Sequence, residues 1–135
     1  MSRILTFHEK DVIGGGSRIG AAYYMEADYS PVAVRIEAEK APSDGELEVD
    51  IYDDGVSIFT NTAAVFSAAP TTKGPTLTSN PSKTTVSLTV GQTHEELVAN
   101  FKSGNIAEGS WITCKIFENR GASNITIQLE LEEIE

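Results

Sequence analysis

The 135-residue sequence has few of the residues that metal and redox sites require. Its only cysteine is Cys114, which excludes an intramolecular disulfide. Its only histidines, His8 and His94, have no second ligand at the spacing of a zinc site. We therefore expect no metal ion and no cofactor. We expect Cys114 to be a small buried hydrophobic residue, because free cysteine is among the most often buried residue types.

Basic residues and long apolar runs are also scarce. The chain has 10 Lys and Arg against 20 Asp and Glu, a formal net charge of −10. This charge repels nucleic acid phosphates and anionic membranes, so we expect neither as a partner. No run approaches the roughly 18 apolar residues of a membrane span, and residues 1–8 do not resemble a signal peptide. The sequence predicts a soluble chain made in the cytoplasm.

Recognisable catalytic motifs are missing as well. Ser17, Ser57 and Ser110 do not lie in the Gly-x-Ser-x-Gly setting of a serine hydrolase. The glycine run at 14–16 superficially resembles a dinucleotide-binding turn, but the residues before it are polar and Arg18 stands where glycine is usual. We interpret the glycine run as a flexible joint and expect no catalytic residues.

A calcium site is the remaining metal alternative. Asp50, Asp53 and Asp54 lie close together, with Glu48 nearby, but they lack the alternate spacing of an EF-hand loop. Alternation with apolar neighbours predicts that Asp50 faces solvent. We therefore interpret these residues as a solvated acidic face followed by a turn.

The clearest pattern that is present lies in residues 46–52. Leu47, Val49 and Ile51 alternate with polar residues, which predicts a strand with one buried face and one solvent face. Asp54-Gly55 is a strong hairpin signal, and residues 56–59 resume the extended pattern.

Alternation predicts further strands over residues 32–40, 85–90, 111–117 and 124–131. The strands at 32–40 and 46–52 and the hairpin return are expected to form three consecutive antiparallel strands. One helix is predicted, because Thr93 and Glu96 have the spacing of a capping box and Leu97, Val98 and Phe101 follow.

These elements indicate an all-β fold, an antiparallel β-sandwich of jelly-roll or Greek-key type. The last strand is expected to pair back near the first strands. Residues 31–135 are predicted to be the sandwich domain, with a long Pro/Ser/Thr loop at 67–84. Residues 1–30 are predicted to be an N-terminal arm with a glycine hinge, in which residues 4–7 form either a short strand or part of the arm. A tether of this kind predicts that deleting residues 1–20 abolishes incorporation into particles but leaves the sandwich folded.

The segments 41–43, 47–51, 57–59, 109–113 and 124–129, together with the Asp54-Gly55 turn, resemble a small β-sandwich module of tailed-bacteriophage virion proteins. The module recurs in tail fibre, receptor-binding and head-associated proteins, and the likeness covers roughly residues 31–132. The long loop and the N-terminal segment depart from it. The resemblance implies a virion protein assembled in the host cytoplasm, and it specifies fold better than function.

The first functional hypothesis is a non-enzymatic protein that decorates or cements the head exterior. We expect it to be a trimer or another symmetric oligomer bound to the major capsid protein. The alternative is a tail-associated carbohydrate- or receptor-binding module, and a hydrolase or lyase is least favoured. Trp111 is expected to pack in the sandwich core. The alternative is a platform for sugars, formed if Trp111 and several of Tyr23, Tyr24, Tyr29 and Tyr52 lie exposed on one surface, and Tyr52 is the preferred exposed aromatic residue. The candidate partner-binding residues are Phe7, Arg18, Tyr23, Tyr52, Lys73 and Pro75.

Overall fold

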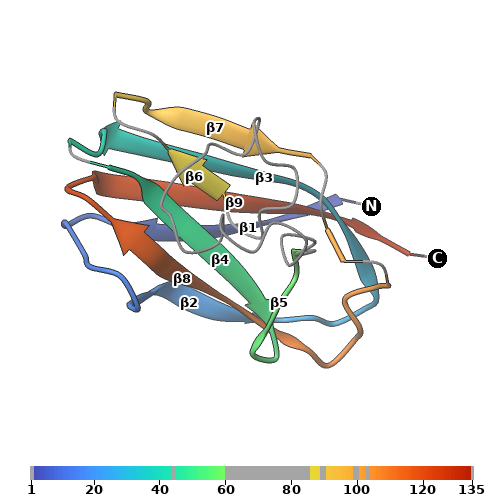
Figure 1. The fold of residues 1–135 in the computed structure, drawn as a ribbon. Helices are drawn as coiled ribbons and strands as arrows, with labels where there is room; N and C mark the ends of the chain where they lie inside the picture. The colour runs from blue at the N-terminus through green and yellow to red at the C-terminus, as the bar shows by residue number, and fades with distance from the viewer. Residues whose placement is uncertain are drawn as a thin grey trace, which may run out of the picture.

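The computed structural model describes residues 2–43, 45–59, 86–88, 91–98, 101–102 and 104–134. These residues form nine strands in two antiparallel sheets that pack face to face, and none of them is helical (Figure 1). The predicted all-β sandwich is therefore confirmed, whereas its jelly-roll or Greek-key type stays a prediction. Within these ranges no helix is long and apolar enough to cross a membrane.

The first sheet has the strand order β1-β9-β3-β7. Its strands are β1 (Ser2–Glu9), β9 (Ser123–Glu133), β3 (Tyr29–Lys40) and β7 (His94–Leu97). Strand β9 is central and pairs antiparallel with β1 and with β3, so that Ile127 lies opposite both Phe7 and Ile36. The prediction that the last strand returns to the first strands is confirmed.

The second sheet has the order β2-β8-β4-β5. Its strands are β2 (Arg18–Tyr24), β8 (Trp111–Asn119), β4 (Leu47–Asp53) and β5 (Val56–Ser57), and β6 (Val86–Leu88) also pairs with β4. Asp54 and Gly55 both have positive φ, 49° and 87°, as a two-residue hairpin turn matched to the strand twist requires. The predicted hairpin is confirmed.

The expectation of three consecutive antiparallel strands is wrong. Strands β3 and β4 follow each other in the chain but lie in different sheets, because β9 and β7 occupy the two sides of β3. The segment between them crosses from one sheet to the other. Figure 1 shows β4 crossing over β9 and β1 of the first sheet instead of running alongside β3.

The core fills the space between the sheets and is built from the inward residues of both. Strand β9 contributes Ile125, Ile127, Leu129 and Leu131, and β8 contributes Ile112, Cys114 and Ile116. Cys114 is fully buried, as predicted.

The N-terminal residues belong to this sandwich. Strand β1 pairs with β9 along its whole length, and β2 pairs with β8. Leu5 and Phe7 are buried because alternate residues of β1 face the core. Residues 2–9 and 18–24 are therefore strands of the two sheets and not an arm outside a domain that begins at residue 31.

The glycine run lies against β8. The Gly16 amide donates to the Ile116 carbonyl at 2.7 Å, and the Ile116 amide donates to the Ser17 carbonyl at 2.7 Å. The Asn119 side-chain amide donates to the Ile13 carbonyl at 2.9 Å. These bonds fix the loop on the second sheet, so the expectation of a flexible joint is corrected.

Gly15→Ala is expected to destabilise the protein by about 1–3 kcal/mol. A Cβ at Gly15 would lie 2.7 Å from the Phe117 carbonyl oxygen, so the backbone must shift. Gly14→Ala is the matched control, because a Cβ there meets nothing within 4 Å. Urea unfolding of both variants measures the difference, and equal stability would show that the loop is not held on β8.

The predicted helix after Thr93 is wrong. Residues His94–Leu97 form strand β7, in which Leu97 pairs with Val34 and His94 pairs with Glu37. The Ala38 amide donates to the Thr93 carbonyl at 2.9 Å, which extends the ladder. Pairing with the edge of β3 therefore replaces the local capping interaction.

Three other predictions fall partly or wholly on residues outside the described ranges. Of the strand predicted at 85–90, residues Val86–Leu88 are confirmed as β6. The remainder of that strand and the loop at 67–84 lie outside the described residues, as do Lys73 and Pro75.

Candidate interaction surface

The outer face of the first sheet is mainly polar, with Ile4 of β1 as an exposed apolar residue. Strand β9 turns Thr126, Gln128, Glu130 and Glu132 outward between its buried residues. Arg35 of β3 binds two glutamates across neighbouring strands: its Nε donates to Glu96 at 2.7 Å and its Nη2 donates to Glu130 at 2.7 Å. Charged groups on this face therefore pair with one another, as on a solvated surface.

The outer face of the second sheet is aromatic. Strand β8 turns Trp111, Thr113, Lys115 and Phe117 outward, while Ile112, Cys114 and Ile116 face the core. Trp111 is 51% exposed and Phe117 is 59% exposed. Tyr24 lies opposite Trp111 on β2, is 48% exposed, and meets the indole edge-on at 5.3 Å. We call these three residues, Tyr24, Trp111 and Phe117, the aromatic face.

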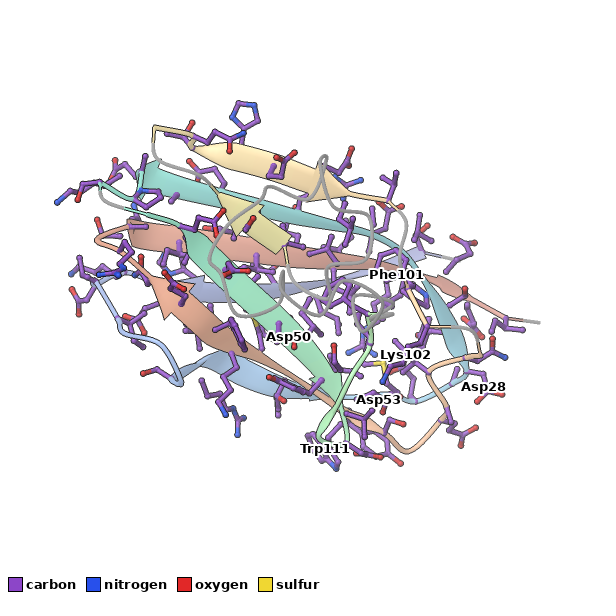
Figure 2. All side chains as sticks on the ribbon, viewed as in Figure 1. Asp28, Asp50, Asp53, Phe101, Lys102 and Trp111 are labelled. Atoms are coloured by element: carbon purple, nitrogen blue, oxygen red, sulfur yellow. The ribbon has the colours of Figure 1, made fainter. Side chains whose placement is uncertain are left out.

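Trp111 is held in place through its backbone. Its amide donates to the Asp54 carboxylate at 2.9 Å, and its carbonyl accepts from the Asp54 amide at 3.0 Å. Figure 2 shows Trp111 at the end of the sheet, beside the β4–β5 turn. The expectation that Trp111 packs in the core is wrong, because Ile112 takes the inward position at the start of β8.

A hollow of about 340 Å³ opens on the same face, next to Lys115. Its lining residues are Arg18, Tyr52, Gly55, Thr113, Cys114 and Lys115. The sheet register places Arg18 directly opposite Lys115 and Tyr52 directly opposite Thr113. Among the described residues, neither cation forms an ion pair with a carboxylate.

The structure brings together two of the predicted partner-binding residues and separates two others. Arg18 and Tyr52 line the hollow, although they are far apart in the sequence. Phe7 is fully buried, so its prediction as a partner contact is wrong. Tyr23 is half-buried, packs its ring on Phe7 at 5.4 Å, and donates its hydroxyl to the Thr6 carbonyl at 2.6 Å. It links the two sheets.

Phe117 and Lys115 were not singled out from the sequence, and Trp111 was expected in the core. Apolar residues occupy both alternating sets within residues 111–117, so either set is a candidate for the core. The signal that decides between them is Lys115, because a lysine is almost never fully buried without a partner. Trp111 and Phe117 share its set and therefore face outward.

Strand β4 carries buried acids on the side away from the core. Glu48 and Asp50 are buried, which corrects the expectation that Asp50 faces solvent. The Asp50 carboxylate accepts from the Ser57 hydroxyl at 2.7 Å and from the Ile51 amide at 2.8 Å. Burial raises the pKa of Asp50 to about 6, and the hydrogen bonds from Ser57 and Ile51 oppose this shift.

The buried groups are not arranged for metal binding or nucleophilic attack. Across the described ranges, no three His, Cys, Asp or Glu side chains gather into a group that holds a metal ion. Burial, and secondarily the charge of Asp50, raises the pKa of the Cys114 thiol. A thiol that stays protonated is a poor nucleophile.

A second, smaller hollow of about 140 Å³ lies beside the hairpin. Asp53 and Lys102 are among its lining residues and carry opposite charges. Figure 2 labels both near the end of β4, together with Phe101. Phe101 stacks on Phe59 at 5.7 Å between ring centroids, which attaches this segment to β5 and its continuation.

Comparison with known proteins gives no family. No protein-family model matches the sequence, and no curated protein matches it. Among solved structures, the chain is similar to the catalytic domain of a GH87 alpha-1,3-glucanase in complex with nigerose, and to its D1069A variant. In both cases the identity is 10%, the TM-score is 0.41, and the match covers 98% of this chain and 28% of the glucanase chain.

Proposed function

We propose that this protein is a non-enzymatic structural component of a bacteriophage particle. It attaches through the aromatic face and decorates the exterior of the head. The observation that supports the proposal most is the contrast between the two outer faces. One sheet presents mainly polar groups, including the paired charges of Arg35, and the other presents the aromatic side chains of Tyr24, Trp111 and Phe117.

This contrast suits a protein that sits on a surface. Exposed aromatic residues are enriched at protein interfaces, where they supply large contact areas. A polar, acidic opposite face suits the outside of a shell, and the formal charge of −10 disfavours contact with packaged nucleic acid. The partners in this proposal are the major capsid protein and other copies of the chain in a trimer or another symmetric oligomer.

Immunogold labelling of intact particles with an antibody to this chain tests the location. Regular labelling over the head is the expected result. Labelling confined to the tail would contradict head decoration, and particles without label would contradict a virion role.

Trp111→Ala is expected to weaken attachment by about 2 kcal/mol or more if Trp111 is a central contact. The fold should remain, because the indole is half-exposed and no core residue is removed. Ile4→Ala is the matched control, since Ile4 is an exposed apolar residue of β1 in the other sheet. Occupancy of purified particles by each variant is the measurement. Equal occupancy for the two variants would exclude the aromatic face as the attachment surface.

The alternative is a tail-associated module that binds carbohydrate or a receptor. The observation that favours it is the exposed Tyr24–Trp111 pair, because aromatic rings also stack on sugars. A glycan array probed with the protein and with Trp111→Ala distinguishes the two functions. Specific glycan binding that disappears in the variant, together with tail labelling, would support this alternative.

A further inference from the structure

We propose that the hollow beside Lys115 is a carboxylate site, and that the aromatic face binds an extended acidic polypeptide segment of the partner protein. This inference rests on the proposed function, because it assigns the chemistry of the partner at the same surface. Its test uses the isolated chain, so it succeeds or fails independently of where the protein lies on a particle.

The first argument is the charge at the hollow. Arg18 and Lys115 lie directly opposite each other on neighbouring strands, and like charges in that position destabilise a sheet. The chain has twice as many acids as bases, yet within the described residues no carboxylate pairs with either cation. Asp50 of β4 lies directly opposite Lys115 in the sheet, but its carboxylate is buried and is hydrogen-bonded by Ser57, Ile51 and Tyr52. The two adjacent cations, which have no carboxylate partner among the described residues, therefore favour the binding of an anionic group from another molecule.

The second argument is the shape of the hollow. It has room for a carboxyl group, and Tyr52 and Thr113 line it beside the two cations. The Tyr52 hydroxyl is already hydrogen-bonded to the Asp50 carboxylate, so it fixes this wall and is not itself a donor to a bound group. Arginine binds a carboxylate with two parallel hydrogen bonds, and lysine adds a point charge. The hollow therefore offers two cations and the Thr113 hydroxyl to one carboxylate.

The third argument is the spacing along β8. Trp111, Thr113, Lys115 and Phe117 are successive outward residues, about 6.6 Å apart. Alternate side chains of an extended polypeptide have the same spacing. If an extended segment lies along β8 with apolar side chains on Trp111 and Phe117, one of the alternate side chains between them lies on Lys115. An acidic residue at that position of the segment would meet the lysine. This periodic match favours an extended polypeptide over a compact ligand.

The test is a titration followed by the fluorescence of Trp111, which is the only tryptophan of the chain and lies on this surface. The probe is a synthetic peptide with the sequence Leu-Ser-Glu-Ser-Glu-Ser-Leu, and its neutral counterpart has Gln in place of Glu. We expect the acidic peptide to change the emission at saturable concentrations and the neutral peptide to bind at least about tenfold more weakly. Added salt should weaken the binding of the acidic peptide, because salt screens the attraction between exposed charges.

Arg18→Glu and Lys115→Glu are each expected to lower the affinity for the acidic peptide about tenfold or more. Lys40→Glu is the matched control, because Lys40 is an exposed lysine of β3 in the other sheet. Circular dichroism checks that all three variants remain folded. An equal loss in Lys40→Glu, or equal binding of the acidic and neutral peptides, would overturn the carboxylate site.

Two further outcomes would also overturn the proposal. Binding of polygalacturonate without binding of the acidic peptide would assign the hollow to an acidic glycan. Concentration-dependent self-association that Lys115→Glu abolishes, without peptide binding, would assign the surface to a second copy of this chain.

Discussion

Phe7→Ala is expected to lower the free energy of unfolding by about 3–5 kcal/mol, the usual cost of removing a large aromatic side chain from a core. Phe7 is fully buried and packs edge-on against Tyr23. A Cβ at Gly20 of β2 would lie only 3.0 Å from the Phe7 Cα, so β1 and β2 are in close contact there. Truncation leaves a cavity between two strands that have little freedom to close it.

Chemical denaturation of Phe7→Ala and of Ile4→Ala measures this effect. Ile4 is on the same strand but exposed, so its truncation should change stability by no more than about 0.5 kcal/mol. Similar small losses in both variants would mean that β1 behaves as a separate arm. The same packing predicts that deleting residues 1–20 prevents folding, because the deletion removes all of β1 and the first residues of β2.

Asp50→Asn is expected to stabilise the protein by up to about 3 kcal/mol above pH 7. The pKa of Asp50 is raised from 3.8 to about 6 in the folded state, so the fold favours the protonated acid. The stability that this group contributes is complete below pH 3.8 and is lost as the pH rises through 6. Asparagine is neutral at every pH, and its carbonyl can still accept hydrogen bonds from Ser57 and Ile51.

Unfolding free energies of the original chain and of Asp50→Asn, measured from pH 4 to pH 8, test this expectation. The difference between the two proteins should grow as the pH rises. Asp53→Asn is the control, because it removes the same charge from a more exposed position of the same strand. If both variants were stabilised equally, general relief of the negative net charge would be the cause.

The fold was predictable where one signal dominated. Strand β9 alternates between buried and outward residues from Asn124 to Glu132, and Asp54-Gly55 is the sequence typical of a tight turn with positive φ. Strand β7 was missed because Thr93 and Glu96 carry a local helix signal, whereas the partner that makes them extended is β3, about 60 residues away in the sequence. A local sequence pattern does not show which strand of a sheet has an unpaired edge to which the segment can add.

The candidate surface was predictable only in part. Arg18 and Tyr52 were proposed separately, and it is the register of β2, β8 and β4 that places them around one hollow. The burial of Asp50 was missed because alternation identifies which residues share a face but does not show what covers that face. Phe7 was misassigned because a single aromatic residue near a chain end has no local signal that separates core from surface.

The hydroxyl of Tyr23 has a consequence for polymerisation. Strands β1 and β2 are the edge strands on one side of the sandwich, and exposed edges are templates for adding strands from other molecules. The Tyr23 hydroxyl of β2 donates a hydrogen bond to the Thr6 carbonyl of β1. In the opposite direction, the Arg3 side chain of β1 donates to the Tyr24 carbonyl of β2 at 3.3 Å. These side chains occupy backbone acceptors that an incoming strand requires. An incoming strand from another molecule therefore finds fewer free backbone acceptors along this side of the sandwich.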